Sequence, residues 1–255
     1  MATSVGVLVR HRRLDRGDRV LVFQGLGGLG KTTLSREVIR RLAEPEAVCT
    51  FWCHELEGTD DPATGLVDKL LVFCRERFGP AWEQIVTAVD HQVGDDPVQR
   101  FGTFANALIE NHEDPLVFYL DNMESLLVGP RRDSESAPPD PASFGQWQSP
   151  ASGQIWGVLA EFAKTKSHVR LVASCRYRNP DFEAARVPVE PLPPDAMWRL
   201  MPWFPGLRRL SRTARLKLVQ RLDGHPRAVE FTNDLIEAQL AKLDSNGPSW
   251  ATPKP

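Results

Sequence analysis

Short runs of consecutive apolar residues alternate with longer amphipathic patterns along most of the chain. Continuous apolar runs are typical of strands buried on both faces. We expect such strands at 20–24, 47–53, 116–121 and 169–174, with a short fifth strand at 187–189. Between the runs, apolar residues recur at the spacing of one helical face. This spacing predicts helices over 31–43, 62–78, 81–89, 97–112 and 153–164. Strands separated by helices form parallel βαβ units, so the pattern predicts an α/β protein with a parallel sheet.

After Pro191 the pattern is purely helical, which indicates a second and smaller part of the chain. His225 stands at the capping position of the last predicted helix, and Pro226 occupies its first position, where proline is favoured. The helices predicted for this part are 194–201, 211–222 and 226–243.

These patterns divide the chain into segments. We expect an α/β core over 1–192, a helical subdomain over 193–243 and a linker or tail over 244–255. Residues 129–150 contain five prolines, several serines and mixed charge. Such a composition predicts a long mobile surface loop within the core.

The composition is that of an ordinary soluble globular protein, with 42% hydrophobic and 25% charged residues. The chain has 31 basic and 33 acidic residues and a net charge of −2, whereas a protein built to coat nucleic acid is usually strongly basic. No apolar run approaches the roughly 18 residues of a membrane span. The run Val5–Val9 is too short for the core of a signal peptide. We therefore expect neither a membrane nor a nucleic acid as partner.

The four cysteines are Cys49, Cys53, Cys74 and Cys175, and none of them forms a CxxC pair. Cys49, Cys53 and His54 lie close together, but in a predicted buried strand, so core packing is favoured over a metal site there. Free thiols suit a reducing compartment, and we expect a cytoplasmic location.

The strongest chemical signal follows the first predicted strand. The segment GLGGLGKT matches the phosphate-binding pattern GxxxxGK[ST] between an apolar strand and an amphipathic helix. Glycines let the backbone approach a phosphate closely, and the helix N-terminus offers N–H groups and the positive end of its dipole. The lysine supplies a charge for the β- and γ-phosphates, and the threonine hydroxyl can bind Mg²⁺. The expected phosphate-binding residues are Gly25, Gly27, Gly28, Gly30, Lys31, Thr32 and Thr33.

A second magnesium ligand is expected on a neighbouring strand. Asp121 ends an apolar run, so we assign Thr32 and Asp121 to the metal; a carboxylate that only caps a turn is the alternative. Asn122 follows directly, where many such ATPases carry a second acid. Glu124 is then the best local candidate to activate a water near the γ-phosphate, the alternative being a solvated acid on a short helix.

Arg176 closes the fourth predicted strand. In a parallel sheet the carboxyl ends of the strands face the ligand crevice. Arg176 is therefore expected to sense or stabilise the γ-phosphate charge, unless it is only a surface arginine paired with Asp181 or Glu183. The Ser174 hydroxyl is a weaker candidate for a contact in the same region.

The segments GLGGLGKTTL, YLDNMESLL, LVASCRYR and LDGHPRAVEF together resemble the STAND-class P-loop ATPases of the NB-ARC type. The resemblance is to bacterial members attached to regulatory, tetratricopeptide-repeat or protease-like domains in particular. The resemblance covers the chain from about residue 18 to about residue 240. It implies a three-layer, parallel-sheet P-loop NTPase core with a C-terminal helical subdomain. Such proteins are switches in which ADP holds a resting form and ATP permits opening and oligomerisation.

The resemblance also implies roles for individual residues. Lys31 and Thr32 would hold phosphate and Mg²⁺, and Arg176 matches the sensor arginine of the family. Pro226 matches the proline of the family's GxP turn, which packs near adenine. The implied cofactors are ATP or ADP with Mg²⁺. The implied activity is slow ATP hydrolysis, with catalytic roles for Lys31, Asp121, Glu124 and Arg176.

Three features depart from the family pattern. Val5-Gly6-Val7 is a poor match to the segment that helps to seat adenine, and Arg227 stands where the GxP turn usually has leucine. The chain also stops where a winged helix usually follows and supplies a histidine to ADP. We therefore expect a module of a longer protein or a truncated reading frame, which binds protein partners or self-associates through flanking domains.

Other functions remain open beside the switch. A nucleotide-binding scaffold that does not hydrolyse ATP is favoured by Asn122, whereas Glu124 favours hydrolysis. A GTPase would need an NKxD-type guanine motif, which is absent from the sequence, and the helical GxP tail argues against a small-molecule kinase. One basic stretch is expected to be a solvated helical face and not a nucleic-acid site; it comprises Arg208, Arg209, Arg212, Arg215, Lys217, Arg221 and Arg227.

Overall fold

The structure is a computed structural model of the chain, and it describes residues 18–42, 49–53, 61–90, 93–112, 114–129 and 140–245. The chain divides into two compact units. The first unit comprises Met1–Gly25 and Lys31–Val189, and the second comprises Leu26–Gly30 and Glu190–Pro255. Some positions considered in the sequence lie outside the described residues, namely Val5-Gly6-Val7, His54, residues 130–139 and residues 246–255.

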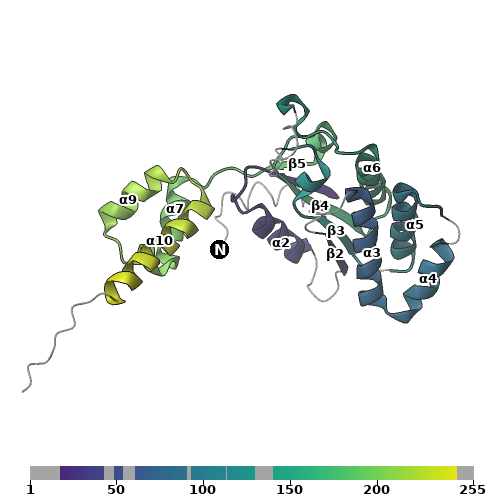
Figure 1. Cartoon of the computed structure of the whole chain (residues 1–255), viewed down its shortest axis with the longest axis horizontal. Helices are drawn as coiled ribbons and strands as arrows, with labels where there is room; N and C mark the ends of the chain where they lie inside the picture. Colours follow the sequence, from purple (N-terminus) through teal and green to yellow (C-terminus); the bar gives the residue numbers. More distant parts are fainter. Residues whose placement is uncertain are drawn as a thin grey trace, which may run out of the picture. The chain divides into compact units, whose positions relative to one another are not determined.

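A five-stranded sheet forms the centre of the first unit (Figure 1), and its strand order is β2-β3-β4-β1-β5. Every pair of neighbouring strands is parallel. The register pairs Ala173 with Val22 on one neighbouring strand and with Leu120 on the other. The carboxyl ends of β1, β3 and β4 therefore meet at the same edge of the sheet. The strands are β1 Val20–Gln24, β2 Cys49–Cys53, β3 Leu116–Leu120, β4 Val169–Cys175 and β5 Arg186–Pro188.

Helices cover both faces of this sheet, which confirms the predicted α/β class with a parallel sheet. Alternate residues of a strand face opposite sides. Phe118 and Leu171 belong to a core cluster that also contains residues of α3, α5 and α6, whereas Val117 and Val172, which are buried as well, point to the other face. The helices of this unit are α2 Lys31–Leu42, α3 Pro62–Phe78, α4 Pro80–Asp90, α5 Pro97–Glu110 and α6 Pro150–Thr165.

Capping residues explain where several of these helices begin. Asp61 and Asp96 accept hydrogen bonds from N–H groups of the first turns of α3 and α5, and a proline follows each of them. Ser149 caps α6 in the same way, with Pro150 next. The helix therefore begins at Pro150, three residues before the start expected from apolar spacing alone. The N-cap and the proline start the helix before its first predicted apolar position.

Part of the segment that was expected to be a mobile loop makes defined contacts. Trp147 forms an antiparallel bridge with Leu127, and its ring packs edge-on against Phe182 at a centroid distance of 5.5 Å. The indole Nε1 donates a hydrogen bond of 2.7 Å to Asp181 Oδ2. An aromatic anchor near the end of the segment thus ties it to the core.

The second unit contains a small helical core of its own. Met197, Met201, Leu207 and Val229 form its fully buried centre. Asn233 is 5% exposed, and its Oδ1 accepts a hydrogen bond of 2.9 Å from the N–H of Gly206. The helices are α7 Pro194–Leu200, α8 Pro205–Arg208, α9 Arg212–Arg221 and α10 Pro226–Ser245, with α8 too short for its apolar spacing to predict it.

The described residues include no helix that is long and apolar enough to cross a membrane. Most basic residues of the helical part lie on the surface of α8 and α9. Of the basic stretch considered in the sequence, Arg215 is half-buried, and the exposed residues are Arg208, Arg209, Arg212, Lys217, Arg221 and Arg227.

Candidate functional site

The predicted phosphate-binding loop connects β1 to α2. Gly28 and Gly30 adopt φ values of 77° and 85°, which lie in the left-handed region that favours glycine. The N–H of Gly25 donates a hydrogen bond of 3.2 Å to the carbonyl of Cys175 at the end of β4. A side chain at Gly25 would collide with the carbonyl oxygen of Val189. Glycine is therefore required at these positions by the conformation of the loop and by its close packing.

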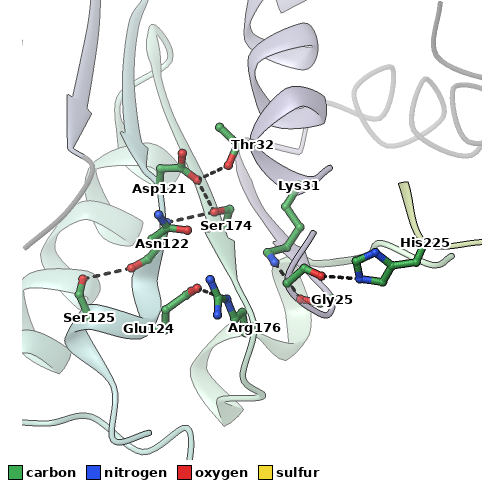
Figure 2. A network of polar contacts seen from close by, with 11 residues as sticks. Gly25, Lys31, Thr32, Asp121, Asn122, Glu124, Ser125, Ser174, Arg176 and His225 are labelled. Carbon is green, nitrogen blue, oxygen red and sulfur yellow. Dashed lines mark hydrogen bonds and ion pairs between the residues drawn. The ribbon is translucent and has the colours of Figure 1, made fainter. Parts of the chain in front are cut away.

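Lys31, the first residue of α2, is 7% exposed. Its Nζ donates a hydrogen bond of 2.9 Å to the carbonyl of Gly25 (Figure 2). Burial lowers the pKa of this ammonium, and the charge of Arg176 lowers it further, whereas the charge of Glu124 raises it. A bound anion would add a further opposite charge beside this buried ammonium.

Three elements bring polar groups together around Asp121, which directly follows β3 and is 5% exposed. The Thr32 Oγ1 of α2 donates to Asp121 Oδ1 at 3.0 Å, and the Ser174 Oγ of β4 donates to the same oxygen at 2.5 Å. The Ser174 oxygen in turn accepts a hydrogen bond of 3.1 Å from the N–H of Asn122 (Figure 2). Hydroxyls from two different elements thus hold the same oxygen of the carboxylate.

Tyr119 is a buried neighbour of this network that the sequence analysis did not single out. It lies on β3 and is 1% exposed. Burial and the charge of Asp121 raise the pKa of Tyr119 well above its usual range, in an environment shared with Ser35 and Thr32. The phenol therefore stays neutral and polar beside Asp121. Its position within an apolar run made it look like a core residue only.

Glu124 and Arg176 form an ion pair, with 2.7 Å between Glu124 Oε1 and Arg176 Nε (Figure 2). The Glu124 side chain is 15% exposed and that of Arg176 46%. Among the described residues, no donor makes a hydrogen bond to either carboxylate oxygen of Glu124 beyond this ion pair. Glu124 is therefore a largely buried carboxylate, not a solvated acid.

The backbone at the end of β3 explains how Glu124 reaches this place. Asn122 adopts the left-handed conformation, with φ 57° and ψ 52°, and a short 3₁₀ helix follows over Met123–Leu126. Asparagine tolerates this conformation better than most residues. The turn ends the strand abruptly and directs Glu124 toward the end of β4.

The structure does not show the alternative ion pairs of Arg176 with Asp181 or Glu183. Asp181 accepts a hydrogen bond from Trp147, and Glu183 pairs with Arg186 at 3.2 Å. Arg176 instead pairs with Glu124, as a residue at the same edge of the sheet. This finding places two of the predicted catalytic residues in direct contact.

The structure thus brings Lys31, Thr32, Asp121, Glu124 and Arg176 together in the first unit (Figure 2). Of the other predicted site residues, Gly25 also belongs to the first unit. Thr33 is exposed and makes no polar side-chain contact among the described residues. Those that belong to the second unit are Gly27, Gly28, Gly30 and Pro226, the last at the first position of α10.

The second unit contains a polar contact that the sequence analysis missed. His225 Nε2 lies 2.9 Å from the carbonyl oxygen of Gly27. The sequence marked His225 only as a residue of the turn and cap before the last helix. A histidine at a cap gives no indication of a distant carbonyl partner, so this contact could not be predicted.

The cysteines whose side chains the structure describes behave as core residues. Cys53, Cys74 and Cys175 are buried free thiols, and burial raises the pKa of Cys53 and Cys175 to about 12. In the described part of the chain, no three His, Cys, Asp or Glu side chains gather as a metal site. Oxygen donors from Thr32 and Asp121 are the pair that suits a hard cation such as Mg²⁺.

The strand order, the glycine loop between β1 and α2, and the Thr32–Asp121 contact define the fold of a P-loop NTPase. No protein-family model matches the chain, and no curated protein matches it in sequence. Comparison with solved structures finds distant similarities. The AAA domain of FIGL-1 in complex with ADP is 14% identical, with a TM-score of 0.46, over 94% of this chain and 68% of that one.

Two archaeal structures are similar to the same degree. A STAND protein with a tetratricopeptide-repeat sensor, PH0952 from Pyrococcus horikoshii, is 13% identical with a TM-score of 0.44, over 87% of this chain and 28% of that one. The Walker-type ATPase of Pyrococcus abyssi is 12% identical with a TM-score of 0.45, over 96% of this chain and 76% of that one. Likenesses this distant do not assign a function.

Proposed function

We propose that this chain is a module that binds ATP and ADP with Mg²⁺, hydrolyses ATP slowly and serves as a STAND-type switch in signalling or regulation. The observation that carries the proposal is the 3.0 Å hydrogen bond between Thr32 Oγ1 and Asp121 Oδ1. It joins the hydroxyl that follows the P-loop lysine to the carboxylate at the end of a neighbouring strand. These are the two oxygen donors that P-loop enzymes use for magnesium.

The residues present fit this metal. Thr32 and Asp121 are hard oxygen donors, and the hydroxyl of Ser174 holds the carboxylate in a fixed orientation. When bound, Mg²⁺ would neutralise part of the charge on the β- and γ-phosphates. Lys31 would leave the carbonyl of Gly25 for the same phosphates, whose negative charge would stabilise the buried ammonium.

Glu124 and Arg176 support the chemical step. A carboxylate that accepts no hydrogen bond among the described residues beyond its ion pair with Arg176 can orient a water and accept its proton as the water oxygen attacks the γ-phosphorus. ADP then leaves with the electrons of the broken P–O bond, and inorganic phosphate is the second product. Arg176 would stabilise the charge that develops on the γ-phosphoryl oxygens.

The ion pair gives a physical reason why hydrolysis would be slow. Glu124 is held by Arg176 at 2.7 Å. The Glu124 carboxylate therefore has to release the guanidinium group and bind a water before it can act as a base. The chain also has Asn122, which cannot accept a proton, at the position directly after Asp121. A switch needs such slow hydrolysis, because the ATP-bound form has to last long enough to act on a partner.

The nucleotide and the partners follow from the motif resemblance. The GxP turn with Pro226 supports an adenine nucleotide, and its place at the first position of α10 gives it a rigid setting. Protein partners, or further copies of the chain, would respond to the bound nucleotide through flanking domains. A cytoplasmic setting suits a module that depends on ATP and has free buried thiols.

Single-turnover hydrolysis of ATP tests this proposal. The wild type should bind ATP and release phosphate slowly. Glu124→Gln should bind ATP with similar affinity but hydrolyse it about a hundredfold more slowly, as is usual for loss of a general base. Glu183→Gln is the matched control, because it removes an exposed acid that pairs with Arg186. Failure of the wild type to bind either nucleotide would overturn the proposal.

A second candidate is a nucleotide-binding scaffold that does not hydrolyse ATP. Asn122 and the Arg176–Glu124 ion pair favour it, since together they leave no free carboxylate next to Asp121. Under this alternative the wild type binds ATP but its phosphate release equals that of Glu124→Gln. The same measurement therefore distinguishes the two functions.

A further inference from the structure

The first turn of α10 holds two carbonyl groups of the glycine loop within the second unit. His225 Nε2 lies 2.9 Å from the carbonyl oxygen of Gly27, and the backbone N–H of Arg227 donates to the carbonyl oxygen of Gly28 at 3.3 Å. Residues 26–30 and the helices after Glu190 belong to the same compact unit. Two residues at the start of one helix, His225 and Arg227, thus hold the loop.

The hydrogen bonds of the imidazole define the role of each ring nitrogen. Nδ1 of His225 accepts a hydrogen bond of 3.3 Å from the N–H of Ala228, in the third position of α10. A neutral imidazole has one acceptor and one donor nitrogen, so Nε2 carries the hydrogen and donates to the carbonyl of Gly27. One side chain therefore caps the helix and holds the loop at the same time.

The turn before α10 explains how His225 reaches the loop. Asp223 and Gly224 both have positive φ, 45° and 73°, so the chain reverses between α9 and α10. A side chain at Gly224 would collide with the carbonyl oxygen of Leu192, so this tight turn requires glycine. The N–H of Leu192 donates to the carbonyl of Gly224 at 2.7 Å, which fixes the turn.

Because peptide groups are planar, these two contacts also fix the direction of the N–H groups in the same peptides of the loop. In a trans peptide the C=O and the N–H point in opposite directions. Holding the carbonyls of Gly27 and Gly28 toward α10 therefore directs the N–H groups of Gly28 and Leu29 away from it. Neither of these N–H groups donates a hydrogen bond among the described residues. Two donors of a phosphate-binding loop are thus aligned and available.

Packing makes this arrangement specific. A Cβ added to Gly28 would come within 2.5 Å of His225 Cε1 and 2.7 Å of Arg227 Cβ. The loop therefore lies directly against the imidazole, with no room for a side chain at Gly28. A change in the ring is expected to reach the loop directly.

We propose that His225 is a positioning residue for phosphate binding, which orients the Gly28 and Leu29 amides by holding the Gly27 carbonyl. The inference rests on the proposed nucleotide-binding function and adds to it a determinant outside the P-loop motif. His225 does not touch the phosphates. Its effect is to align donors before the ligand arrives, which reduces the ordering cost of binding.

Two substitutions separate the two roles of the imidazole. Asn at 225 can accept a hydrogen bond from the Ala228 N–H as a strong N-cap, but its amide is too short to reach Gly27. Gln places an amide donor at about the distance of Nε2 and loses the cap. His225→Asn should weaken ADP binding about threefold to tenfold, the effect of one lost hydrogen bond. His225→Gln should bind ADP within about twofold of the wild type but melt about 2–4 °C lower.

The probe for the phosphate role is inorganic tripolyphosphate, which has no base, used to displace fluorescent ADP. His225→Asn should lower the binding affinities for tripolyphosphate and for ADP by the same factor. Loss of affinity for ADP alone would mean that His225 acts on the adenine side, and the proposal would then be wrong. Equal affinities of His225→Asn and wild type for both ligands would also overturn it.

A measurement without any ligand keeps this inference separate from the proposed function. Backbone ¹⁵N relaxation should show faster internal motion of Gly28 and Leu29 in His225→Asn than in wild type or His225→Gln. If the wild type binds neither ligand, the nucleotide function fails, and the relaxation comparison still decides whether His225 orders the loop. Identical relaxation of these amides in all three proteins would contradict that role.

Discussion

Arg176 at the end of β4 and Glu124 at the end of β3 form a 2.7 Å ion pair in which the arginine is half exposed and the glutamate largely buried. Both residues were expected near the γ-phosphate, but as separate participants. Their contact means that a ligand that attracts Arg176 also frees Glu124. The response of the site to ATP therefore depends on the competition between a carboxylate and a phosphate for one guanidinium group.

Arg176→Ala should make the affinities for ATP and ADP more nearly equal. Only ATP has the γ-phosphate that Arg176 is expected to contact, and a charge-assisted hydrogen bond typically contributes about 1.5–3 kcal/mol. Calorimetry with both nucleotides measures the effect, with the exposed Arg178→Ala as control. An unchanged ratio of the two affinities would show that Arg176 is not a sensor.

Lys31→Met should abolish binding of ATP and ADP and leave the fold intact. Without nucleotide, the free energy of unfolding at neutral pH should rise, because burial lowers the pKa of Lys31 and so penalises its charged form in the folded state. In the wild type this penalty is fully present below the folded-state pKa. It is relieved as the pH rises toward the unfolded value, since the unfolded chain then binds more protons.

Urea denaturation of wild type and Lys31→Met at neutral and at alkaline pH checks this prediction. The stability advantage of the variant should shrink as the pH rises. Retained nucleotide affinity in Lys31→Met would refute the P-loop assignment. An advantage that stays constant with pH would instead refute the proposed cost of the buried ammonium.

Asp121→Asn should weaken binding of Mg·ATP more than binding of ATP in the presence of EDTA. The amide keeps a similar shape and can accept the Thr32 and Ser174 hydrogen bonds, but it lacks the charge that a divalent cation requires. Isothermal titration with and without Mg²⁺ measures the difference. Equal losses under both conditions would make Asp121 a structural residue.

Gly28→Ala should destabilise the protein and weaken nucleotide binding. Its φ of 77° costs a non-glycine residue roughly 1–2 kcal/mol. The new methyl group would also collide with His225 and Arg227. Gly157→Ala in α6 is the matched control, because nothing lies within 4 Å of a Cβ there. It should stabilise the protein by about 0.5–1 kcal/mol. Thermal melts of both variants give the comparison, and the same sign for both would contradict it.

Local patterns were sufficient for most of the fold. The runs at β1, β3 and β4 are buried on both faces and are therefore mostly apolar, which is why their sequence predicts strands so directly. The sequence predicted the glycine loop, Lys31 and Thr32 equally directly, because phosphate binding requires glycine, lysine and a hydroxyl at a set spacing. The short α8 and the contacts of Trp147 were not predicted, since neither depends on a repeated pattern.

The amino-acid sequence by itself determined the strands, the helices and the chemistry available at the end of each strand, because these depend on residues close together in the chain. Only the tertiary structure decided which of these groups meet. The strand order places β3 beside β4 and β4 beside β1, so Ser174 reaches Asp121 and Arg176 reaches Glu124 across more than fifty intervening residues. The bond from His225 to Gly27 likewise spans 198 positions. No local pattern encodes such contacts, since they arise from the packing of whole elements.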